Sequence, residues 1–166
     1  SVAPPPPIGT VNVNWAAAAN GGRASASSYA PASSDGPARP ASMAIDGNMK
    51  TYWEASGPIT GGKTEWLEVE FSASRVINTI RTSSDVGNYP YSMTVEVEEN
   101  GRWIVVGSFT KPSEYQKYMK RSGDVVSFEF QFTAMSVSKV RFVVARVSNP
   151  LNALQFYEVE AFNTGR

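Results

Sequence analysis

The chain contains neither cysteine nor histidine among its 166 residues. Without cysteine it has no disulfide, no thiol nucleophile and no thiolate metal site, although this leaves its compartment open. Without histidine it lacks the commonest general base and the usual zinc ligand. These two absences remove the equipment of thiol, zinc and histidine-dependent catalysis.

Net charge and long apolar runs are also missing. Fifteen basic residues balance 15 acidic ones, so no whole-molecule field draws the chain to nucleic acid or to an anionic membrane. No apolar run approaches the length of a membrane-spanning helix. Leucine occurs only at positions 67, 151 and 154, and no window shows a sustained helical period of apolar residues. We therefore expect no nucleic-acid partner, no membrane span and little helix.

Proline is concentrated at the start, in S-V-A-P-P-P-P-I-G. Such a segment is stiff and extended and has no core of its own. We expect residues 1–10 to be a Pro-rich linker to a covalently attached neighbouring domain. Residues 11–166 have the length of one domain with a substantial core.

The rest of the chain reads as short strands separated by Gly- and Pro-rich turns. Alternating or β-branched runs predict strands at 11–15, 23–28, 65–71, 75–82, 91–97, 103–109, 126–132, 137–147 and about 155–162. Asn100-Gly101 supplies the positive φ angles of a tight hairpin turn between two of them. Residues 29–42 and 110–124 are expected to be long polar loops. The pattern predicts an all-β sandwich.

One stretch, residues 44–53 (A-I-D-G-N-M-K-T-Y-W), gathers oxygen donors around a flexible glycine. Asp46, Asn48 and Thr51 carry oxygens, and Gly47 lets the backbone aim several at one point. Ca²⁺ binds about six to eight such oxygens, many from backbone carbonyls. The spacing also suits an Asx-type turn before a strand, with Trp53 as core, and the residues alone leave both interpretations open.

This motif, with Tyr157-Glu158-Val159-Glu160-Ala161-Phe162 about a hundred residues later, resembles the discoidin or coagulation factor V/VIII type C family. The similarity covers roughly residues 11 to 162. It implies an antiparallel jelly-roll β-sandwich of about eight strands, galactose-binding-domain-like, with a structural cation. The missing cysteines favour the bacterial branch, which includes family 32 carbohydrate-binding modules. The expected protein is bacterial, and is secreted or on the cell surface.

The resemblance also implies the calcium ligands. They are the Asp46 carboxylate, the Asn48 carbonyl, the carbonyl and hydroxyl of Thr51, the carbonyls of Met43 and Tyr157, and the Glu158 carboxylate. The ion would pin the first long loop to the last strand.

We expect no enzymatic activity. Glycoside hydrolysis needs two carboxylates at a controlled separation, one with a raised pKa. The acids on or near predicted loops, Glu54, Glu65, Asp85 and Asp124, belong to no recognisable catalytic motif. The serines have no histidine base.

A non-catalytic module that binds a glycan is the expected function. Sugar sites combine an aromatic face with polar side chains for hydroxyl groups, and in the resembling modules they lie in loops at one end of the sandwich. The matching loops are residues 29–42, 52–64, 83–91, 110–124 and 147–155. They offer Tyr29, Glu54, Asp85, Asn88, Tyr89, Tyr91, Arg146, Asn149 and Asn152. Galactose-binding members commonly have His and Arg where this chain has Glu54 and Ser84-Asp85. This departure predicts that the domain either binds a different sugar or has lost sugar binding.

Two alternatives come from other classes. Factor V/VIII relatives insert apolar loop tips into phospholipid membranes, whereas the tips here are mostly polar. A protein-interaction or adhesion module is the other alternative. Residues 111–121, K-P-S-E-Y-Q-K-Y-M-K-R, form one basic-aromatic segment. It suits an anionic polysaccharide or a solvated hairpin tip, and it is too small for a nucleic-acid site.

Overall fold

The computed structural model describes residues 10–166, so the expected linker lies outside the described residues except for its last position. Strands dominate, with one helical turn and two short 3-10 helices. In chain order the elements are η1 (Ala18–Asn20), β1 (Arg23–Ala26), η2 (Ala41–Ala44), β2 (Trp53–Glu54), β3 (Glu65–Asp85), β4 (Pro90–Glu99), β5 (Arg102–Phe109), α1 (Pro112–Tyr115), β6 (Met119–Ser122), β7 (Val125–Val147), β8 (Gln155–Phe156) and β9 (Glu158–Phe162). Antiparallel pairing throughout confirms the all-β class.

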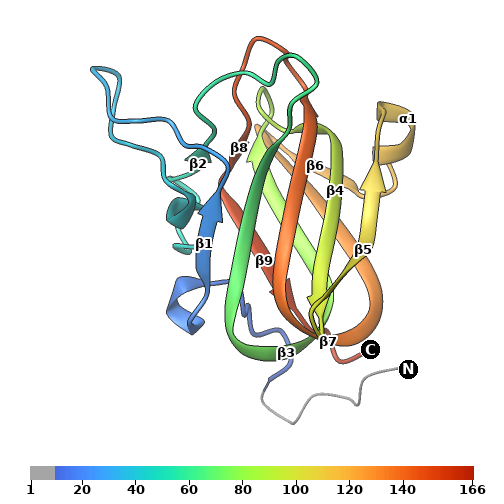
Figure 1. The fold of residues 1–166 in the computed structure, drawn as a ribbon. Coiled ribbons are helices and arrows are strands. Elements are labelled where there is room, and N and C mark those ends of the chain that lie inside the picture. Colours follow the sequence, from blue (N-terminus) through green and yellow to red (C-terminus); the bar gives the residue numbers. More distant parts are fainter. Residues whose placement is uncertain (1–9) are drawn as a thin grey trace.

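Two long strands, β3 and β7, each bend and serve both layers of the sandwich (Figure 1). The first half of β3 pairs with β1 and with the second half of β7, which also pairs with β4. The second half of β3 pairs with β9 and with the first half of β7, which also pairs with β6. Register shifts between Glu70 and Arg75 and between Ile77 and Thr79 mark the bend in β3. Such irregularities let a strand turn a corner.

The core lies between the two layers. Leu67, Val69 and Phe142 from one layer, and Phe128 and Phe130 from the other, are at most 1% exposed. Their alternation with polar residues is the period expected of strands that bury one face. Trp53, at 0% exposed, is core rather than a binding platform, as its sequence context predicted.

The structure corrects four expected elements, two of them because a strand bends and continues. Residues 65–71 and 75–82 join in β3, and residues 126–132 and 137–147 join in β7. The closing segment forms two strands, β8 and β9, instead of one. Residues 110–124 are not a plain loop, because they contain α1 and β6.

The predicted strand at 11–15 is wrong. Asn12 has a φ of 61°, which an extended strand does not allow. The segment is held instead by bonds from the N–H groups of Asn12 and Trp15 to the carbonyls of Asn163 and Ala161. The Asn14 side chain accepts the N–H of Ala161 at 3.0 Å. The hairpin turn at Asn100-Gly101 is confirmed, with φ of 51° and 79°.

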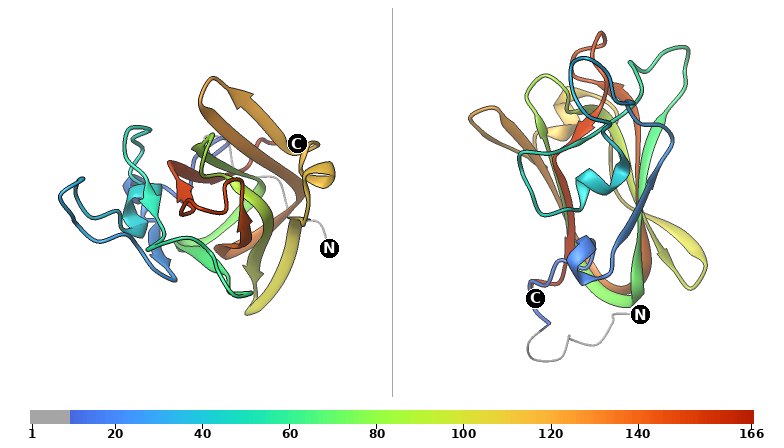
Figure 2. Two further views of the ribbon diagram at one scale, coloured as in Figure 1. Left: turned by 90° about the horizontal axis from the view of Figure 1, so that it is seen from above. Right: turned by 90° about the vertical axis from the view of Figure 1, so that its left-hand side faces the viewer.

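The loops before β2, after β2 and between β7 and β8 rise at the end opposite the C-terminus (Figures 1 and 2). The fold therefore presents one loop-rich rim above a closed core.

No helix among residues 10–166 is long and apolar enough to cross a membrane.

Candidate functional site

The two halves of the resembling motif meet in space. The N–H of Asn48 lies 3.0 Å from Asp46 Oδ1 and 3.1 Å from Glu158 Oε1, which bridges 110 positions of sequence. The Thr51 hydroxyl bonds to Asp46 Oδ2 and lies 3.0 Å from the Asn48 carbonyl. Four of the predicted ligand residues therefore surround one point beside the start of β9.

Two carboxylates face each other there. Glu158 is only 7% exposed. Burial, followed by the hydrogen bond and charge of Asp46, raises the pKa of Glu158 to about 8. A cation between the two groups would offset the repulsion between their negative charges and keep both ionised. The donor set is mostly carboxylate and carbonyl oxygen, which suits Ca²⁺.

The predicted carbonyl ligands lie close in sequence to Asp46 or to Glu158. Asn48 uses its side-chain oxygen to accept the N–H of Lys50 at 2.9 Å, so its backbone carbonyl is the oxygen directed at Thr51. Met43 lies in η2, which packs beside β9. Tyr157 precedes Glu158, and its ring meets that of Tyr52 edge to face at 5.7 Å. Within residues 10–166 no group of three or more acids, histidines or cysteines gathers, so carbonyls must supply most of any calcium shell.

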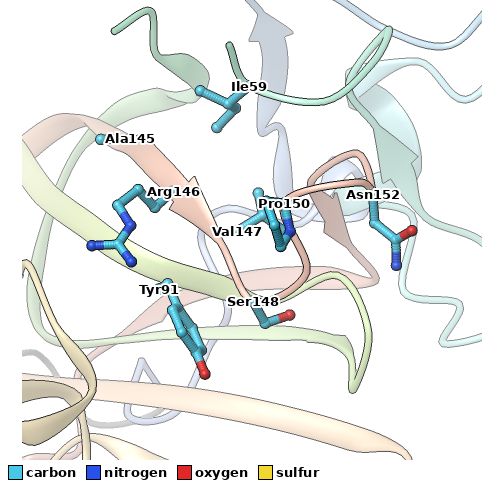
Figure 3. Close-up of a pocket in the computed structure, with 8 residues that line it drawn as sticks. All are labelled: Ile59, Tyr91, Ala145, Arg146, Val147, Ser148, Pro150 and Asn152. Atoms are coloured by element: carbon cyan, nitrogen blue, oxygen red, sulfur yellow. The ribbon is translucent and has the colours of Figure 1, made fainter. Parts of the chain in front are cut away.

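A pocket of about 150 Å³ opens at the loop-rich rim. The end of β7, the β7–β8 loop, the start of β4 and the loop after β2 form its wall. Its lining is Ile59, Tyr91, Ala145, Arg146, Val147, Ser148, Pro150 and Asn152. Figure 3 shows Tyr91 and Arg146 on one side and Asn152 on the other, with Pro150 between them. Three residues from the predicted binding set are thus brought together.

Arg146 is the only charged residue of that lining. It is exposed, and within residues 10–166 it forms no ion pair. Its guanidinium offers a fixed fork of donors to hydroxyl, carboxylate or sulfate oxygens. The Oγ of Ser148, also in the wall, is buried without a hydrogen-bond partner in the described part of the chain. The lining therefore offers hydrogen-bond donors that have no partner in the described part of the chain, and it contains no carboxylate.

A cluster of three packed tyrosines positions the aromatic wall. Tyr91 packs against Tyr89 at 5.7 Å and against Tyr115 of α1 at 5.6 Å between ring centres. Burial, then the hydroxyl of Tyr115, raises the pKa of Tyr89 well above its usual range. Tyr89 is held within this cluster, and Tyr91 is the member that reaches the pocket.

The remaining predicted residues do not line the pocket. Asp85 accepts the N–H of Gly87 at 2.9 Å, and Asn88 donates to the Ala153 carbonyl at 2.7 Å. Asn149 Oδ1 accepts the N–H of Leu151 at 3.0 Å. These side chains hold the loops in shape.

Two further members of the predicted set lie near β2. Glu54 is bonded to Gln155, which faces it across the β2–β8 pair. Tyr29 is 52% exposed on the preceding loop, where the N–H of Ala30 donates to the Glu54 carbonyl. Their part in binding stays a prediction.

The pocket also includes Ile59, Ser148 and Pro150, which the sequence did not single out. All three lie in loops that the resemblance marked as binding loops. Ile59, an apolar residue inside a Gly-rich loop, was the one available signal. Ser148 and Pro150 enter the wall because β7 ends beside β4, where the N–H of Ser148 donates to the Tyr89 carbonyl at 2.8 Å.

Comparison with known families gives one decisive match. The F5/8 type C domain model matches residues 23–159, most of the chain. The chain belongs to the F5/8 type C family. The matched range includes both the Asp46 loop and Glu158, which confirms the resemblance drawn from those two motifs. A search of curated proteins found no match.

Solved structures similar to this F5/8 type C domain are bacterial carbohydrate-binding modules. Chitosan-binding module 1 from the chitosanase/glucanase of Paenibacillus sp. IK-5 shares 23% identity, with a TM-score of 0.68 over 92% of this chain and 100% of that one. The family 32 module of NanJ from Clostridium perfringens, solved with galactose, shares 18% identity, with a TM-score of 0.66 over 86% and 93%. At these identities the similarity establishes the fold.

Proposed function

We propose that this F5/8 type C domain is a non-catalytic carbohydrate-binding module whose ligand occupies the rim pocket. The observation that carries the proposal is that Tyr91 of β4, Arg146 of β7 and Asn152 of the β7–β8 loop line one pocket at the loop end. An aromatic ring beside convergent polar groups is the usual make-up of a sugar site. The chitosan and galactose modules of the same fold support a glycan as the ligand class.

The composition of the pocket supports binding without chemistry. Its lining contains no carboxylate pair, and the chain has no histidine to act as a base. Arg146 is its one charge, so the proposed ligand is a neutral or acidic sugar rather than the cationic glucosamine units of chitosan. Galactose is not favoured, because Ser84, at a position where galactose-binding members commonly have Arg, is 0% exposed inside the sandwich.

A structural Ca²⁺ ion is the second part of the proposal. Asp46, Asn48, Thr51 and Glu158 would hold it, with the carbonyls of Met43 and Tyr157. The contact between Asp46 and Glu158, with the raised pKa of Glu158, supports a cation between them. The ion would fasten the loop before β2 to β9 and thereby support the rim. It has no part in binding the sugar.

The wider role is attachment. Of the two solved modules described above, one is derived from a chitosanase/glucanase and the other is the family 32 module of NanJ. We propose that this module fixes a secreted or cell-surface protein to a glycan, with the Pro-rich residues 1–10 leading to the attached neighbour.

The test is a glycan array followed by calorimetric titration of the strongest ligands. Arg146→Gln should weaken binding about tenfold or more, because it removes the only charged hydrogen-bond donor of the pocket. Arg102→Gln is the matched control, since Arg102 is exposed on the hairpin between β4 and β5 and lines no part of the pocket. Equal affinity of the wild type and Arg146→Gln would contradict this location for the site.

One observation favours a second candidate, a phospholipid surface. Leu151, at the tip of the β7–β8 loop beside Pro150, is 82% exposed. An exposed apolar tip can enter the interfacial region of a bilayer. Pelleting with phosphatidylserine vesicles that is lost in Leu151→Ser, together with a silent glycan array, would favour this function over sugar binding.

A further inference from the structure

A second hollow, of about 340 Å³, lies where β6 pairs with the first half of β7. Its wall consists of Lys117, Tyr118, Met119, Lys120, Glu129 and Gln131. It shares no lining residue with the rim pocket. Residues 117–120 of the basic-aromatic segment therefore form one side of a concave surface.

The backbone holds that segment firmly in place. The N–H of Tyr118 donates to the Tyr115 carbonyl at 2.9 Å, and the Tyr118 carbonyl accepts the N–H of Glu129 at 3.0 Å. Lys120 then pairs with Ser127 across the two strands. Glu129 and Gln131 follow Ser127 at every second position, so these side chains share the outer face of the sheet. The hollow is built on strands rather than on a free loop.

An aromatic ring forms its floor. Tyr118 is half-buried, with its ring centre 4.7 Å from that of Phe130 in the core. The ammonium of Lys117 lies 5.0 Å from the centre of the Tyr118 ring. This contact favours a position of the Lys117 charge over the ring, beside the space that a ligand would occupy.

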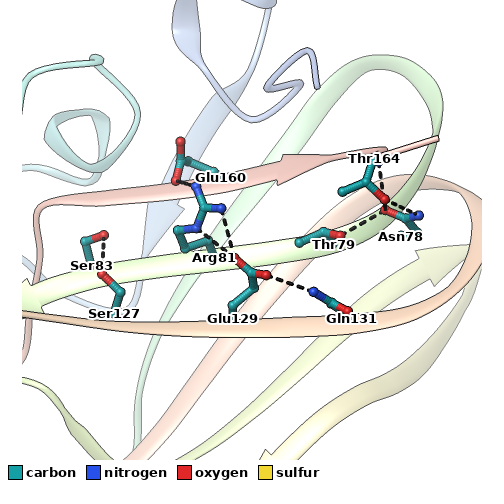
Figure 4. A network of polar contacts seen from close by, with 9 residues as sticks. All are labelled: Asn78, Thr79, Arg81, Ser83, Ser127, Glu129, Gln131, Glu160 and Thr164. Carbon is teal, nitrogen blue, oxygen red and sulfur yellow. Dashed lines mark hydrogen bonds and ion pairs between the residues drawn. The ribbon is translucent and has the colours of Figure 1, made fainter. Parts of the chain in front are cut away.

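The acid in the wall is already neutralised. Glu129 Oε2 lies 2.8 Å from Arg81 Nη2 and 3.1 Å from Arg81 Nε, while Gln131 Nε2 donates to Glu129 Oε1 at 2.9 Å (Figure 4). The hydrogen bond from Gln131, with the Arg81 contact, lowers the pKa of Glu129 below its usual value. Glu129 is therefore fully ionised and fully paired.

Lys117 and Lys120, in contrast to Glu129, have no ion-pair partner among the described residues. Both are exposed. The charge of Lys120 acts on Glu129 and that of Lys117 on Glu114, but neither lysine forms a close ion pair there. With two ammonium groups against the one carboxylate of the lining, the hollow keeps a net positive charge in a protein whose overall charge is zero.

We propose that this hollow is a second ligand site, which binds the carboxylate or sulfate group of an acidic polysaccharide. Lys117 and Lys120 hold the acid group, and the Tyr118 ring, packed on Phe130, positions Lys117. The Gln131 side-chain oxygen accepts a hydroxyl. With two sites on one domain, a single acidic chain gains affinity from simultaneous contact, provided that it spans both.

The surroundings favour a polysaccharide over a bilayer. The large apolar side chains that are most exposed among the described residues are Val11, Tyr29, Met49, Val105 and Leu151, and none of them lines this hollow. A membrane site needs apolar groups that enter the lipid beside the basic ones. A polar ligand with both acid and hydroxyl groups matches the lysines and Gln131 together.

The experiment measures binding of the full chain to polygalacturonate and to dextran sulfate, with neutral dextran as the uncharged control. The double variant Lys117→Gln/Lys120→Gln is compared with Lys63→Gln/Lys111→Gln, which removes the same charge from exposed lysines outside the hollow. We expect at least one acidic polymer to bind. The hollow variant should bind it about tenfold more weakly and with a shallower salt dependence, because two exposed ion pairs are lost. The control variant should stay within about twofold.

Several results would overturn the proposal. They are no binding of either acidic polymer, equal loss in both double variants, or complete loss in Arg146→Gln with none in the hollow variant. Binding of phosphatidylserine vesicles through Lys117 and Lys120, without binding of either polymer, would also reject it. Thermal melts confirm that each variant is folded. The rim pocket is tested separately by neutral array ligands and Arg146→Gln, so either site can fail alone.

Discussion

The facing carboxylates of Asp46 and Glu158 should make the stability of the metal-free protein depend on pH. The folded-state pKa of Glu158 is raised to about 8, by burial and by Asp46, whereas the pKa of an exposed glutamate is about 4.3. Between these values the folded state binds the proton more tightly than the unfolded chain. The free energy of unfolding must therefore fall as the pH rises from about 5 to 8.

The size of this effect follows from the shift. Each pKa unit corresponds to about 1.4 kcal/mol, so a shift of three to four units sets an upper limit of roughly 5 kcal/mol. Relaxation and partial hydration of a group that lies at the edge of the core reduce it, and we expect a loss of about 2–3 kcal/mol. For a domain of this length that corresponds to a fall in Tm of roughly 5–10 °C.

Thermal unfolding followed by circular dichroism, in chelator, from pH 5 to pH 9, measures the effect. Glu158→Gln should flatten the pH dependence, whereas Asp35→Asn, at an exposed acid in the loop before η2, should leave it unchanged. Calcium at about a hundred times its Kd should restore roughly 2.7 kcal/mol at pH 8 in the wild type and far less in Glu158→Gln. An unchanged slope in Glu158→Gln would refute the raised pKa of Glu158, and no response to calcium would refute the ion.

Three other predictions concern packing and charge. Gly107→Ala should destabilise the fold by about 1–3 kcal/mol, because an added Cβ would lie 2.1 Å from Phe130; urea unfolding measures this. Gly101→Val should cost about 1 kcal/mol or more, because φ is 79° there, and the same assay should show no comparable loss for Gly57→Val, whose φ is not positive. Arg81→Met should lower stability at neutral pH, since it unpairs Glu129. Because the pKa of Glu129 is lowered, that contribution disappears as the pH falls through the folded-state value, and an acid titration of wild type and variant should converge.

Alternation of apolar and polar residues predicted most strands correctly, since it records which face is buried whatever the partner strand is. It failed where the chain bends. Nothing local distinguishes a strand that ends from one that turns a corner, so residues 65–82 read as two strands instead of the single β3. At residues 11–15 the alternation was misleading, because Asn12 adopts a positive φ and Asn14 bonds to the backbone of β9.

Polar loop residues posed a different problem. Sequence marked Asp85, Asn88 and Asn152 alike as potential sugar contacts, because each has the right chemistry on the right loop. Asp85 and Asn88 are engaged by backbone groups of the loops. Asn152 also donates to a loop carbonyl, that of Gly87, yet it borders the pocket. The number of hydrogen bonds already satisfied depends on how the loops close, and that is a property of the folded chain.

The amino-acid sequence determined the β class, the Asn100-Gly101 turn and the pairing of the Asp46 loop with Glu158, because each rests on local conformational preference or on a family motif. Tertiary structure alone decided which rim residues share a pocket, and that Lys117 and Lys120 lie beside Tyr118 without an ion pair to any described residue. Both depend on the path of β3 and β7 through two layers. That path brings together side chains that are distant in sequence, and no local preference encodes their meeting.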